Sequence, residues 1–273
     1  MSKRHDKMES SKILETSLKI IETASKKNIV LRLMGAAAIR IHSPKYGSLY
    51  EVLERDLSDI DCVSLGCFRD AIKQHLKMLN YVPRWFDEMP SIEEMRRMKS
   101  RVLVLERASL YRQIYDNPEN GITIDVFFDK LEMCHTIDFR NRLTIDYPTI
   151  PLAEILLSKM QIVKLTEKDV KDVIVLLLEH EVGDTDNDTI NSKYISKVLS
   201  KDWGFYYTFT TNLKRIRDEL ITLYSDKLKE ENVSEVKTKI NKILVNVEAA
   251  PKSIGWKLRS TIGTKKIWYR EVE

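Results

Sequence analysis

Cysteine is scarce in this chain, which argues against a fold held together by disulfide bonds. Cys62, Cys67 and Cys134 are the three cysteines among 273 residues, and no two of them form a C-x-x-C pair. An odd number of cysteines at irregular spacing does not make a disulfide framework. A reducing compartment suits such a chain, so we expect a cytoplasmic protein.

Long apolar runs are missing as well. No stretch approaches the roughly 18 apolar residues that a membrane-spanning helix requires. Residues 1–12 are polar and charged and lack the apolar segment of a signal peptide. We therefore expect a soluble chain with no membrane partner.

Several catalytic motifs are also absent. The chain has no G-x-x-x-x-G-K-[ST] phosphate loop and no G-x-S-x-G nucleophile turn, which argues against P-loop kinases and α/β-hydrolases. The five histidines show no H-E-x-x-H or other zinc-binding spacing; they are His5, His42, His75, His135 and His180. The sequence therefore predicts neither of these enzyme classes and no zinc site.

Residues 184–188 resemble a calcium loop at first sight, because three aspartates alternate there. The glycine required at the sixth position is missing, and Ile195 stands where the bidentate glutamate belongs. A solvated turn between helices is the better interpretation.

The overall charge balance does not demand a nucleic-acid partner, but its distribution is uneven. Hydrophobic residues make up 43% and charged residues 32%, with a net charge of +4. Residues 251–273 carry six Lys or Arg against two Glu, and six minus two equals that whole excess. Trp256, Trp268 and Tyr269 interleave with these cations. The basic tail therefore suits looped or single-stranded RNA, or else a docked segment with a solvated basic face.

Hydrophobic periodicity predicts a mixed α/β arrangement in the N-terminal half. A helix over 11–27, a buried strand over 29–34 and a helix over 36–41 come first. A strand over 59–65, helices over 68–79 and 92–98, and a strand over 101–105 follow. Asn117-Pro118-Glu119-Asn120-Gly121 is a turn signal between apolar stretches, which predicts a hairpin of 111–115 with 122–128.

The pattern changes near Pro148 and Pro151, where we place a domain boundary. Beyond it the periodicity is helical, over 152–165, 167–178, 192–199, 213–228 and 236–247. The aromatic residues between 203 and 209 are most simply core between helices. We expect an α+β protein with a mixed α/β domain at 1–150 and an all-helical domain at 151–273.

Asp59 and Asp61 are the most informative pair in the chain. Their i, i+2 spacing puts both carboxylates on one face of the strand predicted over 59–65. Paired carboxylates on a rigid strand can hold hard divalent cations, and two such cations can clamp the oxygens of a nucleotidyl transfer. A solvated acidic turn is the competing interpretation of the pair alone.

Asp125 and Gly35 extend this pattern. Asp125 lies in the middle of an apolar strand, where a carboxylate is costly unless it is paired, bound to metal or on a solvated face. Gly35 ends one strand and opens a helix, and the absence of a Cβ would let a phosphate approach the N–H groups of that helix. Alone, Gly35 could be a simple turn glycine.

The order Gly35, Asp59-x-Asp61 and Asp125 on successive strands resembles the nucleotidyltransferase superfamily with its polymerase-β-like palm fold. The resemblance implies that the three aspartates hold two Mg²⁺ (or Mn²⁺) ions and that Gly35 lies against the triphosphate of an NTP. The stretch from Arg55 through Ser58 to Asp61 is similar to the second motif of that family. Ala36 stands where the family usually has Ser or Gly, so a phosphate-binding hydroxyl is missing.

The C-terminal half resembles the helical part of prokaryotic nucleotidyltransferase-like proteins of the abortive-infection and toxin type. The similarity rests on residues 151–161 and 167–172, while residues 202–204 and 251–259 resemble an uncharacterised bacterial and archaeal branch. It implies a nucleotide contact for Lys159, which lies on an apolar helix stripe and could otherwise snorkel to its rim. Thr166 and Asp169 form a capping-box pattern, and Asp172 could pair with Lys159 or Lys168 or contact a ligand.

Together these patterns predict a Mg²⁺-dependent nucleotidyltransferase that moves an NMP from an NTP to a hydroxyl of RNA, a small molecule or a protein. Its predicted nucleotide-binding residues are Gly35, Ala36, Arg55, Ser58 and Lys159. Two alternatives stay open: a catalytically weak nucleotide- or RNA-binding module of the same fold, and one half of a toxin–antitoxin pair.

Overall fold

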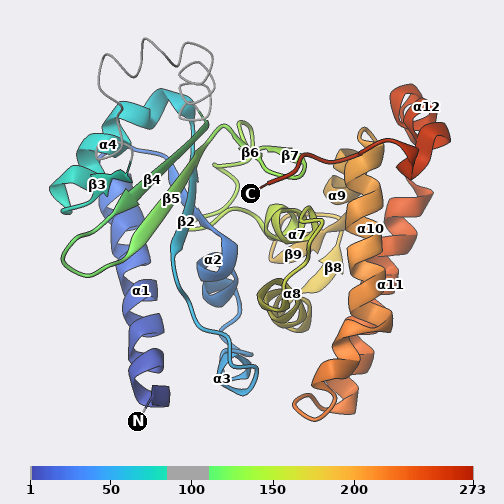
Figure 1. Ribbon diagram of the computed structural model, residues 1–273, viewed down its shortest axis with the longest axis horizontal. Helices are drawn as coiled ribbons and strands as arrows, with labels where there is room; N and C mark the ends of the chain where they lie inside the picture. Colours follow the sequence, from blue (N-terminus) through green and yellow to red (C-terminus); the bar gives the residue numbers. More distant parts are fainter. Residues whose placement is uncertain (1, 85–110, 273) are drawn as a thin grey trace. The chain divides into compact units, whose positions relative to one another are not determined.

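The computed structural model describes residues 2–84 and 111–272 (Figure 1). Within these residues the chain is an α+β protein, with a five-stranded mixed sheet in its N-terminal half and a mostly helical C-terminal region. The helix predicted over 92–98 and the strand predicted over 101–105 lie outside the described residues.

The chain divides into two compact units, each made of three segments. The first, here called the sheet unit, comprises Met1–Ala37, Asp56–Leu131 and Asp138–Ile150. The second, here called the helical unit, comprises Ala38–Arg55, Glu132–Ile137 and Pro151–Glu273. The sheet unit ends at residue 150 and the helical unit continues from residue 151, where the periodicity of the sequence also changes. Residues 38–55 and 132–137, which come earlier in the chain, also belong to the helical unit.

The sheet has the strand order β1-β2-β5-β4-β3. Its strands are β1 (Leu31–Met34), β2 (Ile60–Ser64), β3 (Val82–Pro83), β4 (Arg112–Asp116) and β5 (Thr123–Phe128). The central pair β2 and β5 is parallel, and the other neighbours are antiparallel. The predicted hairpin is confirmed as β4–β5, and the Gly121 N–H closes its turn by donating to the Asn117 carbonyl at 2.9 Å.

Two helices cover one face of this sheet. They are α1 (Ser2–Ser25) and α4 (Arg69–Met78), the latter preceded by the short 3-10 helix η1 (Gly66–Phe68) (Figure 1). The Arg69 guanidinium lies 4.9 Å from the ring centre of Phe128 on β5, and His75 Nε2 lies 3.3 Å from the Ile20 carbonyl of α1. Strand residues alternate between faces, so Asp125 points away from this helical layer.

Most of the helical unit consists of helices. Helix α2 (Gly35–His42) starts in the sheet unit and ends in the helical unit. The other helices are α3 (Leu49–Val52), α7 (Leu152–Met160), α8 (Glu167–Glu179), α9 (Ser192–Leu199), α10 (Trp203–Asp218), η3 (Leu220–Tyr224), α11 (Glu230–Ala249), α12 (Ile254–Ile262) and η4 (Gly263–Lys265).

The prediction that the region after residue 150 is all-helical is wrong. Strands β8 (Glu181–Gly183) and β9 (Thr189–Asn191) form a parallel pair around residues 184–188, which therefore connect strands and not helices. A second small sheet joins β6 (Lys130–Glu132) and β7 (Thr136–Asp138). Strands of three residues are too short to show a period in the sequence.

Several predicted helices have different bounds in the structure. Helix α7 ends at Met160 instead of continuing to 165, and α10 begins at Trp203, ten residues before the predicted start at 213. Asp202 caps α10 by accepting a hydrogen bond from the Phe205 N–H. The aromatic residues that begin α10 have modest helix propensity, so the sequence pattern did not predict a helix there. The burial of Trp203, Phe205 and Phe209 confirms that these residues belong to the core.

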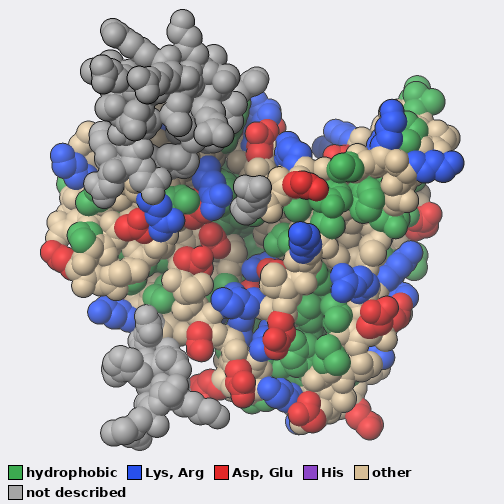
Figure 2. Space-filling view, in the orientation of Figure 1, with side chains coloured by type: hydrophobic (Ala, Val, Ile, Leu, Met, Phe, Trp, Pro, Cys, Tyr) green, Lys and Arg blue, Asp and Glu red, His purple; other side chains and the backbone are tan. Residues whose placement is uncertain are grey.

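The surface carries charges of both signs. Figure 2 shows Lys and Arg interspersed with Asp and Glu over the face in view. In the part of the chain that is described, every helix is too short or too polar to cross a bilayer.

Candidate functional site

Asp61 and Asp125 lie directly opposite each other on the parallel strands β2 and β5. Register partners on neighbouring strands point to the same face, so both carboxylates lie on the face that α1 and α4 leave uncovered. Asp59 comes just before β2 and is exposed, whereas Asp125 is only 8% exposed. Ser58 is exposed and donates a hydrogen bond to Asp59 at 3.0 Å.

Gly35 lies against the carboxylate of Asp61. The last residue of β1, Met34, is the register partner of Asp61, and Gly35 follows it with a φ of +63°. A Cβ at Gly35 would lie 2.2 Å from Asp61 Oδ2, so any side chain there would displace this carboxylate. Ala36 is buried in the first turn of α2. Only glycine combines this backbone conformation with this close approach.

Arg112 of β4 is a further site residue, which no sequence motif indicates. Its Nε lies 3.1 and 2.9 Å from the two carboxylate oxygens of Asp125, and its Nη2 donates to Oδ2 at 2.6 Å. Its guanidinium also lies 5.3 Å from the ring centre of Phe127. The predicted hairpin could have indicated this contact. Pairing Arg112 with Phe127 places both side chains on the face of the sheet that carries Asp125.

The charge of Asp125 is set by opposing influences. Burial raises the pKa of Asp125 above its ordinary value, and the negative charge of Asp59 acts in the same direction. The hydrogen bonds and charge of Arg112 partly offset the effect of burial. Asp125 is therefore a more basic carboxylate than an exposed aspartate, held beside a cation.

A second arginine–aspartate pair lies next to the first on the sheet. Arg84 donates to both oxygens of Asp116 at 2.8 and 2.7 Å, and the Thr123 hydroxyl donates to Asp116 at 2.8 Å. Asp116 and Thr123 are register partners, and Thr123 lies two residues from Asp125 along β5 while Asp116 lies four residues from Arg112 along β4. The uncovered face thus carries both carboxylates and guanidinium groups.

The three aspartates of the predicted metal site do not form a tight cluster in this conformation. Among the described residues, they are not a set whose ligand atoms all lie within 4.8 Å of one another. Like charges repel at short range, and Arg112 holds the carboxylate of Asp125. The fold brings these residues to one region of the sheet, with Arg112 in contact with one of them.

Arg55 and Lys159 lie in the helical unit, where both contact Asp172. Arg55 Nε and Nη2 each donate to a different oxygen of Asp172 at 3.0 Å. Lys159 Nζ lies 2.9 Å from Asp172 and 3.1 Å from Asp169. The pairing of Asp172 with Lys159 and the capping box of Thr166 with Asp169 are confirmed. Nucleotide contacts of Arg55 and Lys159 stay a prediction.

The carboxylate of Asp172 is 0% exposed, so this ion network is a structural element of the helical unit. Burial alone would raise the pKa of Asp172, but the charges and hydrogen bonds of Lys159 and Arg55 hold that pKa below its ordinary value. Two partners therefore keep a buried carboxylate ionised.

The basic tail packs against its own unit, as one of the two interpretations predicted. The Arg270 N–H donates to the Cys134 carbonyl at 3.0 Å, and its guanidinium donates to the Met133 carbonyl at 2.8 Å. Trp268 Nε1 donates to the Thr208 hydroxyl of α10 at 3.0 Å. RNA binding by the exposed lysines of this tail stays a prediction.

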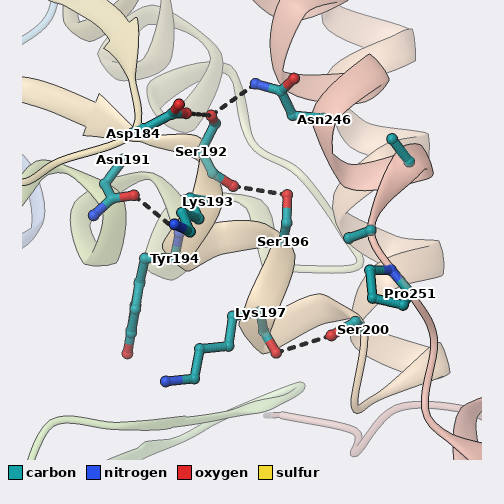
Figure 3. A pocket seen from close by; sticks show the side chains of 12 residues that line it. Asp184, Asn191, Ser192, Lys193, Tyr194, Ser196, Lys197, Ser200, Asn246 and Pro251 are labelled. Atoms are coloured by element: carbon teal, nitrogen blue, oxygen red, sulfur yellow. Dashed lines mark hydrogen bonds between the residues drawn. The ribbon is translucent and has the colours of Figure 1, made fainter.

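The helical unit also contains an open pocket of about 750 Å³ beside α9 and the end of α11 (Figure 3). Within it, Asn246 donates to the Ser192 hydroxyl at 2.8 Å, and the Asn191 side chain accepts from the Tyr194 N–H. The residues predicted from the sequence to bind nucleotide do not line this pocket.

No family model matches the chain, and no curated protein shows significant similarity to it.

Proposed function

We propose that the chain is a Mg²⁺-dependent nucleotidyltransferase, which moves an NMP from an NTP to a hydroxyl acceptor. The proposal includes a polymerase-β-like palm fold for the sheet unit. The single observation that carries it is the side-by-side placement of Asp61 and Asp125 on parallel strands, with Gly35 against Asp61.

The residues fit a hard divalent cation such as Mg²⁺ or Mn²⁺, because Asp59, Asp61 and Asp125 offer carboxylate oxygens. Gly35 leaves the Asp61 carboxylate uncrowded, which a Cβ would prevent. When bound, such cations neutralise phosphate charge and polarise the reacting oxygens. Asp59, Asp61 and Asp125 would supply the oxygen ligands, and Asp125 is also in contact with Arg112.

The chain's own side chains have separate roles in this proposal. Asp125 accepts the proton of the acceptor hydroxyl, a task for which its raised pKa suits it. The first N–H groups of α2, next to Gly35, face the phosphates of the NTP. Arg84 and Arg112 place positive charge on the same face, where guanidinium groups bind phosphate oxygens well.

The contact between Arg112 and Asp125 specifically favours a second candidate, a nucleotide-binding module with little turnover. A carboxylate whose two oxygens already accept from a guanidinium has fewer lone pairs left for a metal ion or for the proton of an acceptor. Ala36 also offers no hydroxyl to a phosphate. In this alternative the site holds an NTP without transferring it.

The direct experiment measures incorporation of labelled NTPs into total cellular RNA, small metabolites and protein, with Mg²⁺ and with chelator. We expect Mg²⁺-dependent incorporation that is lost in Asp125→Asn. Calorimetry should show Mg²⁺-dependent NTP binding that is lost in the double variant Asp59→Asn/Asp61→Asn. Asp70→Asn is the matched control, since Asp70 is an exposed carboxylate on α4, which covers the other face.

The outcomes separate the two candidates. NTP binding that needs Asp59 and Asp61 but gives no incorporation with any acceptor supports the binding module. Mg²⁺-dependent NTP binding that survives the double variant contradicts both, because the cation would then lie elsewhere.

A further inference from the structure

Two histidines and an aspartate that are far apart in the sequence meet in the helical unit. His42 is the last residue of α2, His180 follows α8 directly, and Asp188 lies just before β9. One potential ligand atom from each lies within 4.8 Å of the other two. Because 138 residues separate His42 from His180, no spacing motif could reveal this group.

The hydrogen bonds of His180 fix which of its ring nitrogens is available. Its Nε2 lies 2.9 Å from the backbone carbonyl of His42, and a carbonyl only accepts, so Nε2 carries the hydrogen. The other nitrogen, Nδ1, lies 3.2 Å from Asp188 Oδ1. In the neutral ring this nitrogen presents a lone pair to a carboxylate, a contact that needs a proton or a cation between the two atoms.

A metal ion is a cation that suits this position. It would use the neutral ring of His180, which is only 4% exposed, together with the exposed carboxylate of Asp188. The carbonyl bond to Nε2 is the kind of outer contact that orients a metal-binding histidine.

We propose that His42, His180 and Asp188 bind a zinc ion, with the fourth position open to water or an exchangeable ligand. Zinc bonds of about 2.0–2.1 Å in tetrahedral geometry place neighbouring ligand atoms about 3.3 Å apart. The 3.2 Å between His180 Nδ1 and Asp188 Oδ1 matches that separation.

The ligand chemistry separates this site from the acidic face of the sheet unit. Two imidazoles with one carboxylate suit zinc and neighbouring transition metals, whereas Mg²⁺ and Ca²⁺ prefer all-oxygen sites. The proposal therefore does not depend on nucleotidyl transfer, and either can fail alone.

Existing contacts already hold the ends of α2 and α8 near each other. Glu179, the last residue of α8, accepts a hydrogen bond from the Tyr46 N–H at 3.0 Å. His42 and His180 also pack edge to face, with ring centres 5.7 Å apart. A metal ion would thus join two segments that are arranged before it binds, and it would raise the stability of the helical unit by mass action.

The test uses the full chain, freed of metal with chelator and titrated with Zn²⁺ against a chromogenic competitor. We expect one tight site per chain, and visible ligand-field bands of a four-coordinate ion when Co²⁺ replaces Zn²⁺. Asp188→Asn and His42→Gln should each weaken Zn²⁺ binding at least about tenfold, since even outer-contact changes cost that much. Asp188 is exposed, so its variant tests the site with little risk to folding.

Two controls make the result specific. Asp186→Asn changes a carboxylate of the same loop outside the cluster and should leave Zn²⁺ affinity unchanged. Asp59→Asn/Asp61→Asn removes the acidic pair of the sheet unit and should also leave it unchanged. The proposal is overturned if wild type binds no Zn²⁺, or if His42→Gln and Asp188→Asn bind Zn²⁺ as tightly as wild type, which would leave His180 and Asp188 as a simple ion pair.

Discussion

Arg112 holds both carboxylate oxygens of Asp125 from the neighbouring strand, with nitrogen–oxygen distances between 2.6 and 3.1 Å. This contact places a fixed cation next to the residue that our proposal makes the proton acceptor. Any divalent ion bound by Asp59 and Asp61 would feel that positive charge. The strength of the predicted Mg²⁺ site therefore depends on Arg112.

Replacing Arg112 with Gln should tighten Mg²⁺ binding in the presence of an NTP. Loss of one nearby positive charge at a partly exposed site is equivalent to about 1 kcal/mol, or about fivefold in affinity. Calorimetric Mg²⁺ titration at fixed NTP measures the change. Lys77→Gln is the control, because Lys77 is an exposed cation on α4, which covers the other face of the sheet. An unchanged or weaker Mg²⁺ affinity in Arg112→Gln would count against a cation beside Asp125.

Gly35→Ala should damage both stability and nucleotide binding. A left-handed backbone costs a non-glycine residue about 1–2 kcal/mol, and the new Cβ would also displace the Asp61 carboxylate. Gly121→Ala is a matched control, since Gly121 has a φ of +71° but nothing within 4 Å of its added Cβ. Chemical unfolding should show a loss in both variants, while calorimetry should show lost NTP binding in Gly35→Ala only. Equal NTP affinity of Gly35→Ala and Gly121→Ala would show that Gly35 is not part of the nucleotide site.

Arg55→Met should lower the free energy of unfolding by about 3 kcal/mol. It leaves the fully buried Asp172 with the charge of Lys159 but without the two hydrogen bonds from Arg55, and breaking a buried ion pair costs several kcal/mol. Lys229→Met is the control, because its pair with Glu231 is exposed and worth less than about 1 kcal/mol. Urea unfolding measures both. A small effect at Arg55 would show that the network contributes little to stability.

His135 should make the protein sensitive to mild acid. Burial lowers the pKa of His135 to about 4, below the ordinary 6.5 of the unfolded chain. Between these values the unfolded state binds a proton that the folded state does not, so stability is lost as the pH falls through this window. The loss approaches about 3 kcal/mol near pH 4.

Urea unfolding of wild type and His135→Gln at pH 7 and pH 5 measures this contribution. Glutamine cannot titrate and can keep a polar contact with the Thr208 hydroxyl, which lies 2.8 Å from His135 Nε2. The wild type should lose more stability than the variant between the two pH values. Identical losses would assign the acid sensitivity to other groups.

Local signals in the sequence identified much of the sheet unit. The turn at residues 117–121 fixed the β4–β5 hairpin, and the acidic pair marked the start of β2, with Asp61 on the strand and Asp59 just before it. The capping box at Thr166 located the start of α8. These features are governed by contacts a few residues apart, which leave a readable pattern.

Other features left no such pattern. The three-residue strands β8 and β9 are stabilised by pairing with each other, and α10 begins among aromatic residues of modest helix propensity. The aspartates were found because their spacing is a motif, whereas the arginine beside Asp125 depends on strand register across a hairpin.

By itself the sequence determined the α+β composition, the change of pattern at residue 150 and the identity of the acidic residues on the sheet. Only the tertiary structure decided which charges neutralise one another: Arg112 with Asp125, and Arg55 with Asp172. It alone brought His42, His180 and Asp188 together. The reason is physical, since secondary structure follows from near neighbours, whereas charge pairing and metal ligation depend on contacts that folding creates. These contacts cross a hairpin for Arg112 and Asp125, and join segments more than a hundred residues apart for Arg55 with Asp172 and for His42 with His180.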